Sequence, residues 1–312
     1  MPQIVKPRKL TPNATIGIIS PASPMVPEKL EMGVRYLENL GYRVEIGKAV
    51  HKTDGYLAGS DEERIADLEQ MFARKDIDAI FCSRGGYGTP RLLHKINYDL
   101  IRQNPKIFVG YSDLTALQLA IFAKTGLVTF SGPMVAVELA NGIKPQTEDN
   151  FWRTITSAEP LGTLRPLQNN LTALNRHNGV GPILPGCLSV IAGIAGTEFF
   201  PRQEGCVLLF EDVGEKPYRI DHYLAQLQNA GVLAGLGGAI AGQFSDCLPS
   251  DDTPSWTIDE ILRDYFADAS YPTITGFDYG HDSIKYTIPV GVPVRLKTDP
   301  IAVEITESAV LE

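Results

Sequence analysis

Ser112 is the residue of this 312-residue chain whose setting is most typical of a catalytic nucleophile. It follows the apolar run 107–109 and a glycine, and it precedes the alanine- and leucine-rich segment 115–123. This order predicts a strand, a turn and a helix. A serine on such a turn can hold its hydroxyl clear of a sheet, with backbone N–H groups facing an oxyanion. The same position is also typical of a helix N-cap, and Leu114 stands where the usual G-x-S-x-G elbow has its second glycine.

Acidic side chains that could serve a catalytic histidine lie about a hundred residues downstream. Glu211 and Asp212 end the apolar run 207–210, which is typical of a strand, and Glu215 lies in the following turn. One of these carboxylates could orient an imidazole at the exposed strand end. Acidic residues that simply flank a strand in solvent have the same pattern.

His281 is the best candidate for a general base. Of the five histidines, it alone is set among glycines and an aspartate, in the segment 276–282 (GFDYGHD). Histidine is the residue type most often used for proton transfer near neutral pH. A solvent-facing loop histidine is the alternative.

The segment 83–88 (SRGGYG) is a candidate anion-binding loop, because glycines at a strand end let backbone N–H groups turn toward an anion. A dinucleotide site is weakly supported, since Arg91 occupies the last position of G-x-G-x-x-G. No Gly-Lys-Ser/Thr follows for a P-loop. The loop therefore fits a donor for an oxyanion better, with a plain tight turn as the alternative.

The elements that must position these residues alternate along the first two-fifths of the chain. Strands are expected at 15–19, 42–46, 78–82 and 107–109, and helices at 28–40, 61–74 (capped by Ser60), 91–96 and 115–123. This alternation predicts an open parallel sheet in an α/β layer. Ser20, Ser83 and Ser112 all fall at carboxyl ends of strands, where ligands gather in such sheets.

The second half of the chain has another character. Residues 137–178 break the alternation, and beyond them short β-type runs at 206–210, 239–241 and 292–296 accompany one good helix at 219–230. We expect an amino-terminal α/β nucleophile domain (1–137), an inter-domain connection (138–178) and a smaller, β-rich α+β domain (179–312).

Composition and charge narrow the class of protein. With 44% hydrophobic and 21% charged residues the chain is typical of a globular protein, and a net charge of -9 argues against a nucleic-acid partner. The run 16–19 is too short for a signal peptide or membrane span, so a soluble, cytoplasmic protein without membrane contact is expected. Cys82, Cys187, Cys206 and Cys247 form no C-x-x-C pair, so neither disulfides nor zinc are predicted.

Four motifs in this order and spacing resemble the LD-carboxypeptidases (muramoyltetrapeptide carboxypeptidases) of serine peptidase family S66: RGGYG at 84–88, GYSDLT at 110–115, FEDVGE at 210–215, and GH at 280–281 with PVG at 289–291. The resemblance implies a Ser-His-Glu triad of Ser112, His281 and Glu211. The chemistry of such a triad requires no metal or cofactor, and the backbone N–H groups of Gly86 and Asp113 are the proposed oxyanion donors. Two departures are visible, since Cys187 replaces a more usual Asn and His222 a more usual Arg.

The resemblance also implies a substrate and an assembly. The terminal D-alanine of a murein tetrapeptide would be removed at an L,D bond during cytoplasmic cell-wall recycling, by a homodimer. Arg84 is a candidate for binding the substrate carboxylate, and holding the turn by hydrogen bonding is the alternative. The runner-up is a microcin-immunity-type serine peptidase that cleaves an aminoacyl-nucleotide conjugate, a branch expected to carry an added aromatic segment before the acidic motif. Here that interval holds only Phe151 and Trp152 as a notable aromatic pair. A non-catalytic nucleotide- or peptide-binding module is the alternative of another class.

Overall fold

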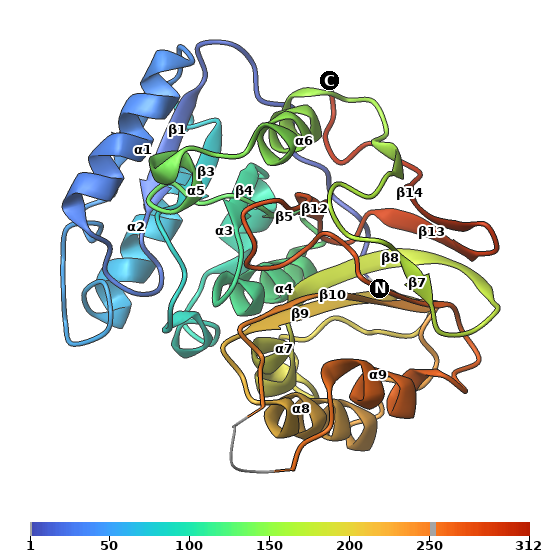
Figure 1. Ribbon diagram of the computed structural model, residues 1–312. Coiled ribbons are helices and arrows are strands. Elements are labelled where there is room, and N and C mark those ends of the chain that lie inside the picture. Colours follow the sequence, from blue (N-terminus) through green and yellow to red (C-terminus); the bar gives the residue numbers. More distant parts are fainter. Residues whose placement is uncertain (1, 250–253) are drawn as a thin grey trace.

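The computed structural model describes residues 2–249 and 254–312 as two sheets with helices packed on their faces (Figure 1). The first sheet has the strand order β12-β5-β4-β3-β1-β2, and its neighbouring strands are parallel except β12, which pairs antiparallel with β5. The open parallel sheet expected for the amino-terminal part is therefore confirmed. Its strands are β1 (Thr15–Ile19), β2 (Arg43–Ile46), β3 (Ala79–Cys82), β4 (Ile107–Gly110), β5 (Phe130–Ser131) and β12 (Ile288–Pro289).

The central strands of this sheet are apolar because helices cover both of its faces. Every residue of β1, β3 and β4 is buried, whereas edge strand β2 is mostly exposed. Continuous apolar runs of this kind are typical of parallel strands. The surrounding helices are α1 (Pro27–Asn39), α2 (Asp61–Ala73), α3 (Tyr98–Gln103), α4 (Leu114–Thr125), α5 (Glu138–Asn141) and α6 (Pro145–Thr156).

The predicted cap of α2 is confirmed. Ser60 accepts a hydrogen bond from the backbone N–H of Glu63, whose carboxylate accepts one from the backbone of Ser60 in return. This reciprocal capping box satisfies two N–H groups that the first helical turn leaves without partners.

The helix expected at 91–96 is wrong. A short 3-10 helix, η1 (Thr89–Arg91), is followed by turns, and the regular helix α3 starts only at Tyr98. The side chain of Asn97 accepts the backbone N–H of Leu100 and so caps α3. The apolar spacing in 91–96 comes instead from Leu92 and Leu93, which lie buried in a turn.

The second sheet has the order β6-β14-β13-β8-β9-β10-β11-β7. Its segment β8-β9-β10-β11 is parallel and the other pairings are antiparallel, which confirms the mixed, β-rich character expected for the carboxyl-terminal part. The strands are β6 (Gly162–Leu164), β7 (Thr172–Ala173), β8 (Asn178–Cys187), β9 (Val207–Val213), β10 (Gly238–Ser245), β11 (Thr273–Thr275), β13 (Pro293–Thr298) and β14 (Ile301–Ile305).

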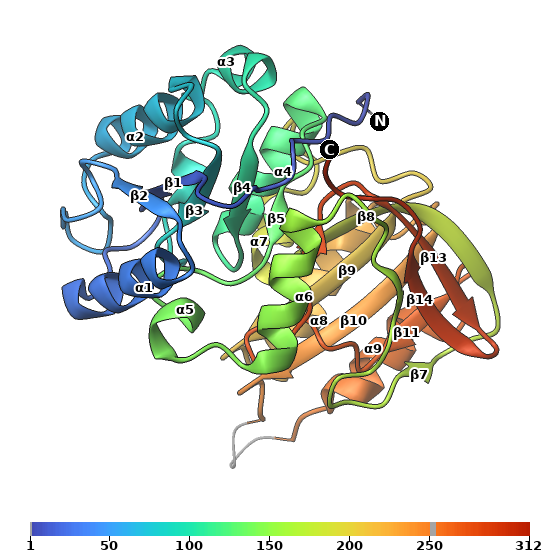
Figure 2. The ribbon, with the colours of Figure 1, turned by 90° about the horizontal axis from the view of Figure 1, so that it is seen from above.

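The helices join the two sheets into one packed body. The helices α7 (Leu188–Ile194), α8 (Pro217–Asn229) and α9 (Ile258–Phe266) lie together on one side of the second sheet (Figure 1). A buried apolar cluster runs from Leu117 of α4 to Ile191 of α7 and Leu224 of α8. Seen from above, α6 stands between the two sheets (Figure 2).

Candidate active site

The turn between β4 and α4 holds Ser112 in a strained conformation. Its φ is +65°, and the other described non-glycine residues with positive φ are Asn13 and Asp246, whose types tolerate that region. A serine there costs about 1–3 kcal/mol, and such strain is typical of functional sites. The helix N-cap is Asp113, which makes no side-chain cap, so the interpretation of Ser112 as the cap is wrong.

The second glycine of the usual elbow is not needed here, because Gly110 supplies the room. A side chain at Gly110 would place its Cβ 2.9 Å from Leu114 Cγ and 3.2 Å from Cys82 Cβ. Leu114 is itself fully buried. The close approach of β4 to the start of α4 is thus made on the strand side of the elbow.

The glycine loop 84–88 lies directly against the serine. A Cβ at Gly85 would lie 3.0 Å from Ser112 Cβ and 3.2 Å from its Oγ. Gly86 and Gly88 have φ values of +112° and +138°, which only glycine adopts without strain. The loop therefore brings backbone, rather than side chains, close to the Ser112 hydroxyl.

Asp113 and Thr89 fasten this loop to the elbow. The buried Asp113 carboxylate accepts the backbone N–H of Thr89 at 2.8 Å, and its carbonyl accepts the Thr89 hydroxyl at 2.5 Å. Burial raises the pKa of Asp113, against the lowering effect of these Thr89 hydrogen bonds. The side chain of Asp113 therefore has a structural role behind the elbow, while its N–H stays with the candidate oxyanion donors.

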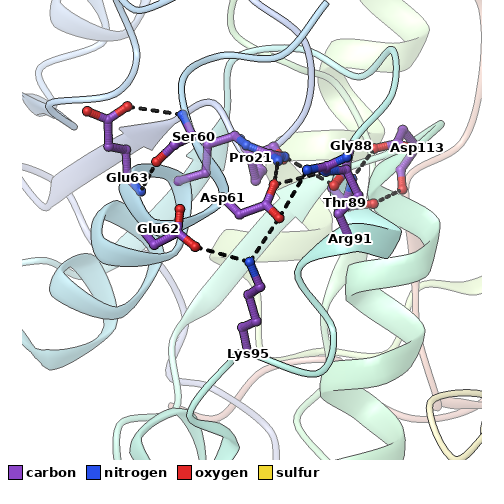
Figure 3. Close-up of polar contacts among 11 residues, drawn as sticks. Pro21, Ser60, Asp61, Glu62, Glu63, Gly88, Thr89, Arg91, Lys95 and Asp113 are labelled. Carbon is purple, nitrogen blue, oxygen red and sulfur yellow. Dashed lines mark hydrogen bonds and ion pairs between the residues drawn. The ribbon is translucent and has the colours of Figure 1, made fainter. Parts of the chain in front are cut away.

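A buried guanidinium supports the same loop, next to the cluster in which Asp61 contacts Arg91 and Lys95 (Figure 3). Arg64 is 1% exposed and donates to the carbonyl oxygens of Pro21 at 2.5 Å and Gly88 at 3.1 Å. Its other terminal nitrogen lies 2.6 Å from Asp61, which Arg91 and Lys95 also contact at 3.0 Å. The hydrogen bond from Arg91 above all holds the pKa of Asp61 at about 2.

Arg84 is half-buried at the start of the loop. Its Nη1 lies 3.4 Å from the carbonyl oxygen of Pro24, which is long for a hydrogen bond. The turn therefore gains little from Arg84. Its guanidinium keeps N–H groups available, which supports a role in binding a substrate carboxylate.

His281 connects the serine to an acid of the second sheet. Its Nε2 lies 3.1 Å from Ser112 Oγ, and its Nδ1 lies 2.8 Å from Glu211 Oε2. A carboxylate only accepts, so Nδ1 carries the proton and donates to Glu211, leaving Nε2 to accept the serine hydroxyl. The structure thus brings together the three residues that the sequence proposed as a triad.

The glycine before His281 leaves room for the Glu211 carboxylate. A Cβ at Gly280, whose φ is +146°, would lie 3.1 Å from Glu211 Oε2. Glu211 is 1% exposed, and its burial raises its pKa against the lowering effect of the His281 hydrogen bond. Asp212 instead accepts the backbone N–H of Ser189 at the start of α7, and Glu215 accepts the Tyr223 hydroxyl.

The two departures from the family pattern occupy different places. Cys187 is buried and lies opposite Glu211 in the β8–β9 register, with its Sγ 3.4 Å from Asp212 Oδ1. Burial raises the pKa of its thiol well above the ordinary value, so it is held as a neutral group rather than a nucleophile. His222 is exposed on α8 beside Tyr223.

A cavity of about 260 Å³ opens beside His281. A larger hollow of about 590 Å³ lies between the starts of α8 and α9, but none of the triad candidates lines it, so we take the smaller one as the candidate substrate site. Its wall includes three residues that sequence reasoning missed, Tyr111, Glu138 and Lys144. It is lined by Tyr111, Val137, Glu138, Asn141, Gly142, Ile143, Lys144, His281 and Ser283.

Residues 2–249 and 254–312 contain neither a metal-binding cluster nor a membrane-spanning helix. In that part of the chain no group of three or more His, Cys, Asp or Glu side chains is arranged to hold a metal ion. Nor does it contain a helix that is both long and apolar enough to cross a membrane.

Comparison with known proteins places this geometry in a family. Residues 16–132 match the N-terminal domain and residues 180–296 the C-terminal domain of the LD-carboxypeptidases, peptidase family S66. The chain belongs to the LD-carboxypeptidase family.

Relatives carry two kinds of name. The probable murein peptide carboxypeptidase of Bacillus subtilis is 38% identical, covering 94% of this chain and 92% of its own. The structure of muramoyltetrapeptide carboxypeptidase from Oxalobacter formigenes superposes with a TM-score of 0.82 at 30% identity, and the match covers 93% of this chain and 97% of that one. The microcin C7 self-immunity protein MccF of Escherichia coli is 30% identical, covering 94% and 93%. Its complex with aspartyl sulfamoyl adenosine superposes with a TM-score of 0.89 at 27% identity, covering 98% and 100%.

Proposed function

We propose that this protein is a serine-type, metal-independent LD-carboxypeptidase that removes the terminal D-alanine of murein tetrapeptides. The observation that carries the proposal is the hydrogen-bonded series Glu211, His281 and Ser112, with the serine on a strained elbow. Nucleophile, base and orienting acid lie within the distances that such chemistry requires.

In the proposed reaction, His281 Nε2 takes the hydroxyl proton as Ser112 Oγ attacks the carbonyl carbon of the L,D bond. Backbone N–H groups of Gly86 and Asp113 stabilise the oxyanion, a donor of this kind contributing about 3–4 kcal/mol. The imidazolium then protonates the amine of D-alanine as the C–N bond breaks. Water, deprotonated by His281, hydrolyses the acyl-enzyme and restores Ser112.

Arg84 does not line the cavity beside His281, but it begins the glycine loop that lies against Ser112, where a guanidinium suits a peptide carboxylate. We expect Arg84→Met to raise KM at least tenfold with a smaller effect on kcat, because the contact would be made equally in the ground and transition states. A raised KM should not appear in Arg43→Met, whose guanidinium bonds Thr15 at the edge of the first sheet.

The runner-up is a peptidase that cleaves aminoacyl-nucleotide conjugates, as the ligand of the MccF complex suggests. One observation favours the murein peptide. Phe151 is fully buried against Phe81, and Trp152 stacks on Tyr42 at 5.3 Å and donates to the Tyr36 hydroxyl. The aromatic pair between the serine and acid motifs is therefore committed to packing α6 and is not free to stack on a base.

A paired assay tests the proposal. Purified protein, with a chelator present, should release D-alanine from a murein tetrapeptide and leave aminoacyl-sulfamoyl adenosine intact. The reverse result would transfer the chain to the runner-up function. A non-catalytic binding module predicts turnover of neither substrate and full ligand binding by Ser112→Ala.

The family resemblance further supports a cytoplasmic role in recycling cell-wall fragments and assembly as a homodimer. Light scattering on the eluting protein tests the assembly. A mass near twice the 34.1 kDa of the chain is expected, and a mass of one chain contradicts it.

A further inference from the structure

A buried ion pair lies beside the catalytic histidine, outside the proposed triad. Lys285 Nζ is 2.6 Å from Glu138 Oε1, and their side chains are only 3% and 9% exposed. The contact is an ion pair without the alignment of a hydrogen bond, and the ammonium lies 3.9 Å from the centre of the Tyr111 ring. Burying two charges is expensive and gives little net stability compared with apolar residues of similar size. The pair therefore requires another explanation.

Tyr111 connects this pair to the catalytic residues. Its hydroxyl donates to Glu138 Oε1 at 2.8 Å, and its ring meets the His281 ring edge-on at 5.1 Å. Tyr111 also directly precedes Ser112 in the chain. One rigid side chain thus contacts the histidine, the ion pair and, through the backbone, the elbow.

The three members come from separate parts of the fold. Tyr111 lies on the elbow, Glu138 begins α5, and Lys285 lies four residues after His281 in the connection from β11 to β12. The remaining oxygen of Glu138 accepts the backbone N–H of Met134 at 3.0 Å, which fixes the carboxylate. The ion pair therefore holds the histidine-bearing segment against the domain that carries the serine.

The rest of that segment is held in the same direction. Thr147 of α6 bonds the carbonyl of Ser283 and the N–H of Lys285, each at 3.0 Å. Asn150 accepts the N–H of Thr287 at 2.7 Å. These backbone contacts fix the path of the segment, whereas the Tyr111 ring, held by the ion pair, contacts the imidazole itself.

We propose that Lys285 and Glu138 are positioning residues that act through Tyr111 to fix the His281 imidazole toward Ser112. This inference rests on the proposed function, because it assumes that His281 is the base. Neither charged group contacts the reacting atoms. Both determine the wall against which the imidazole lies, and Glu138 and Tyr111 also line the cavity.

The test compares Lys285→Met, Lys285→Arg and the double variant E138Q/K285M with the wild type. A loosened imidazole should lower kcat of Lys285→Met by about 10–100-fold, the range expected for a misplaced catalytic group, with KM changed less than threefold. Lys285→Arg keeps the charge and should recover most of kcat. The kcat of the double variant should be higher than that of Lys285→Met, because the double variant leaves no unpaired buried carboxylate.

Arg295→Met is the matched control, since Arg295 pairs with Glu304 at 2.7 Å in an exposed hairpin of β13 and β14. It should keep wild-type kcat. All rates are referred to correctly folded protein, measured by thermal unfolding. Should Lys285→Met not fold, Tyr111→Phe, which keeps the ring and removes the hydroxyl contact, is expected to lower kcat severalfold.

The inference is overturned if folded Lys285→Met, or Tyr111→Phe in its place, keeps kcat within twofold of wild type. It is also overturned if Lys285→Arg is as slow as Lys285→Met. A second readout is the rate at which a fluorophosphonate labels Ser112, which needs no peptide. Wild-type labelling without D-alanine release contradicts the proposed substrate alone, and slower labelling of Lys285→Met then still supports the positioning role. Absence of both activities in wild type overturns both proposals.

Discussion

Ser112 combines a strained backbone with a hydrogen bond to an imidazole, and the two belong together. The positive φ aims the hydroxyl away from the helix cap that its sequence position also suggested, and toward His281. Strain at one residue is kept when its surroundings over-determine it, here through the glycine loop and the close approach at Gly110.

Substitutions at Ser112 separate the two features. Ser112→Ala and Ser112→Gly should both lower turnover by about a million-fold, by analogy with serine protease triads. The free energy of unfolding of Ser112→Gly should nevertheless exceed that of Ser112→Ala by about 1 kcal/mol, because glycine adopts a positive φ without strain. Equal stabilities of the two variants in urea titrations would contradict the strain argument.

In the proposed mechanism Glu211 acts on the histidine alone. Glu211→Gln keeps the shape but can donate to Nδ1, which favours the wrong tautomer, so kcat should fall by about 10⁴-fold. Asp212→Asn is the control in the next position along β9, where the carboxylate serves the start of α7. It should affect stability more than kcat. A larger loss of kcat in Asp212→Asn would assign the acid to Asp212.

The residues of the site were predictable to different degrees. Ser112 and His281 were candidates on their own neighbourhoods, whereas the choice of Glu211 among three carboxylates came from the family resemblance. Glu138 follows the apolar run 134–137 and Lys285 lies between Ile284 and Tyr286, and no motif or spacing relates the two positions. Their pairing is a property of the fold alone.

At the scale of elements, the site depends on how the glycine loop is braced. The elbow is held to the loop by the contacts between Thr89 and Asp113 (Figure 3). The loop is held to the start of α2 by Arg64. The regular helix in this part of the chain begins only after Asn97, whose side chain caps α3, and it does not extend over 91–96.

Loss of this brace should be costly. Arg64→Met leaves the carbonyl oxygens of Pro21 and Gly88 without their buried donor, and it should lower the free energy of unfolding by about 3 kcal/mol. Arg102→Met, which removes an exposed pair with Asp99, should change it by less than about 0.5 kcal/mol. Urea titration measures both. Similar values for the two variants would show that the brace contributes no more than a surface pair.

The ion pair of Glu138 with Lys285 makes the free energy of unfolding depend on pH in the acid range. Burial raises the pKa of Glu138, but Lys285 and the hydrogen bonds from Met134 and Tyr111 together lower it below the ordinary value. A carboxyl group with a lowered folded-state pKa stabilises the fold fully above its unfolded pKa of about 4.3, and this contribution is lost as pH falls through the folded-state pKa.

We therefore expect Glu138→Gln to be less stable than wild type at pH 7, with a gap that begins to close only below about pH 4.3. Glu307→Gln, which removes an exposed pair with Lys6, should show a small gap throughout. Urea titrations across this pH range provide the measurement. A gap for Glu138→Gln that is constant down to pH 3 would contradict the assigned ionisation.

At the scale of the whole molecule, the histidine segment links the two sheets. The chain leaves the second sheet after β11, passes Tyr279, whose hydroxyl lies 2.8 Å from Ser131 Oγ, and then adds β12 to the edge of the first sheet. Ser112 and Glu211 lie on different sheets, and His281 lies on the segment that joins them. The distances among Ser112, His281 and Glu211 therefore depend on the correct packing of both sheets.

The two-sheet α/β fold was predictable because long apolar runs and capped helices are strong local signals. Strand β12 was not, because two residues carry no periodicity and their partner in β5 lies far away in the sequence. The proposed boundaries 1–137, 138–178 and 179–312 describe the chain as two domains and a connection. The return of β12 to the first sheet adds a crossing that such boundaries do not express.

The proposed serine mechanism is best tested by the release of D-alanine from a murein tetrapeptide, measured for wild type and Ser112→Ala with a chelator present. Wild-type protein should release D-alanine, and the variant should be slower by about a million-fold, with both proteins folded. Release that survives the substitution, or wild-type protein that cleaves only an aminoacyl-nucleotide conjugate, would contradict it.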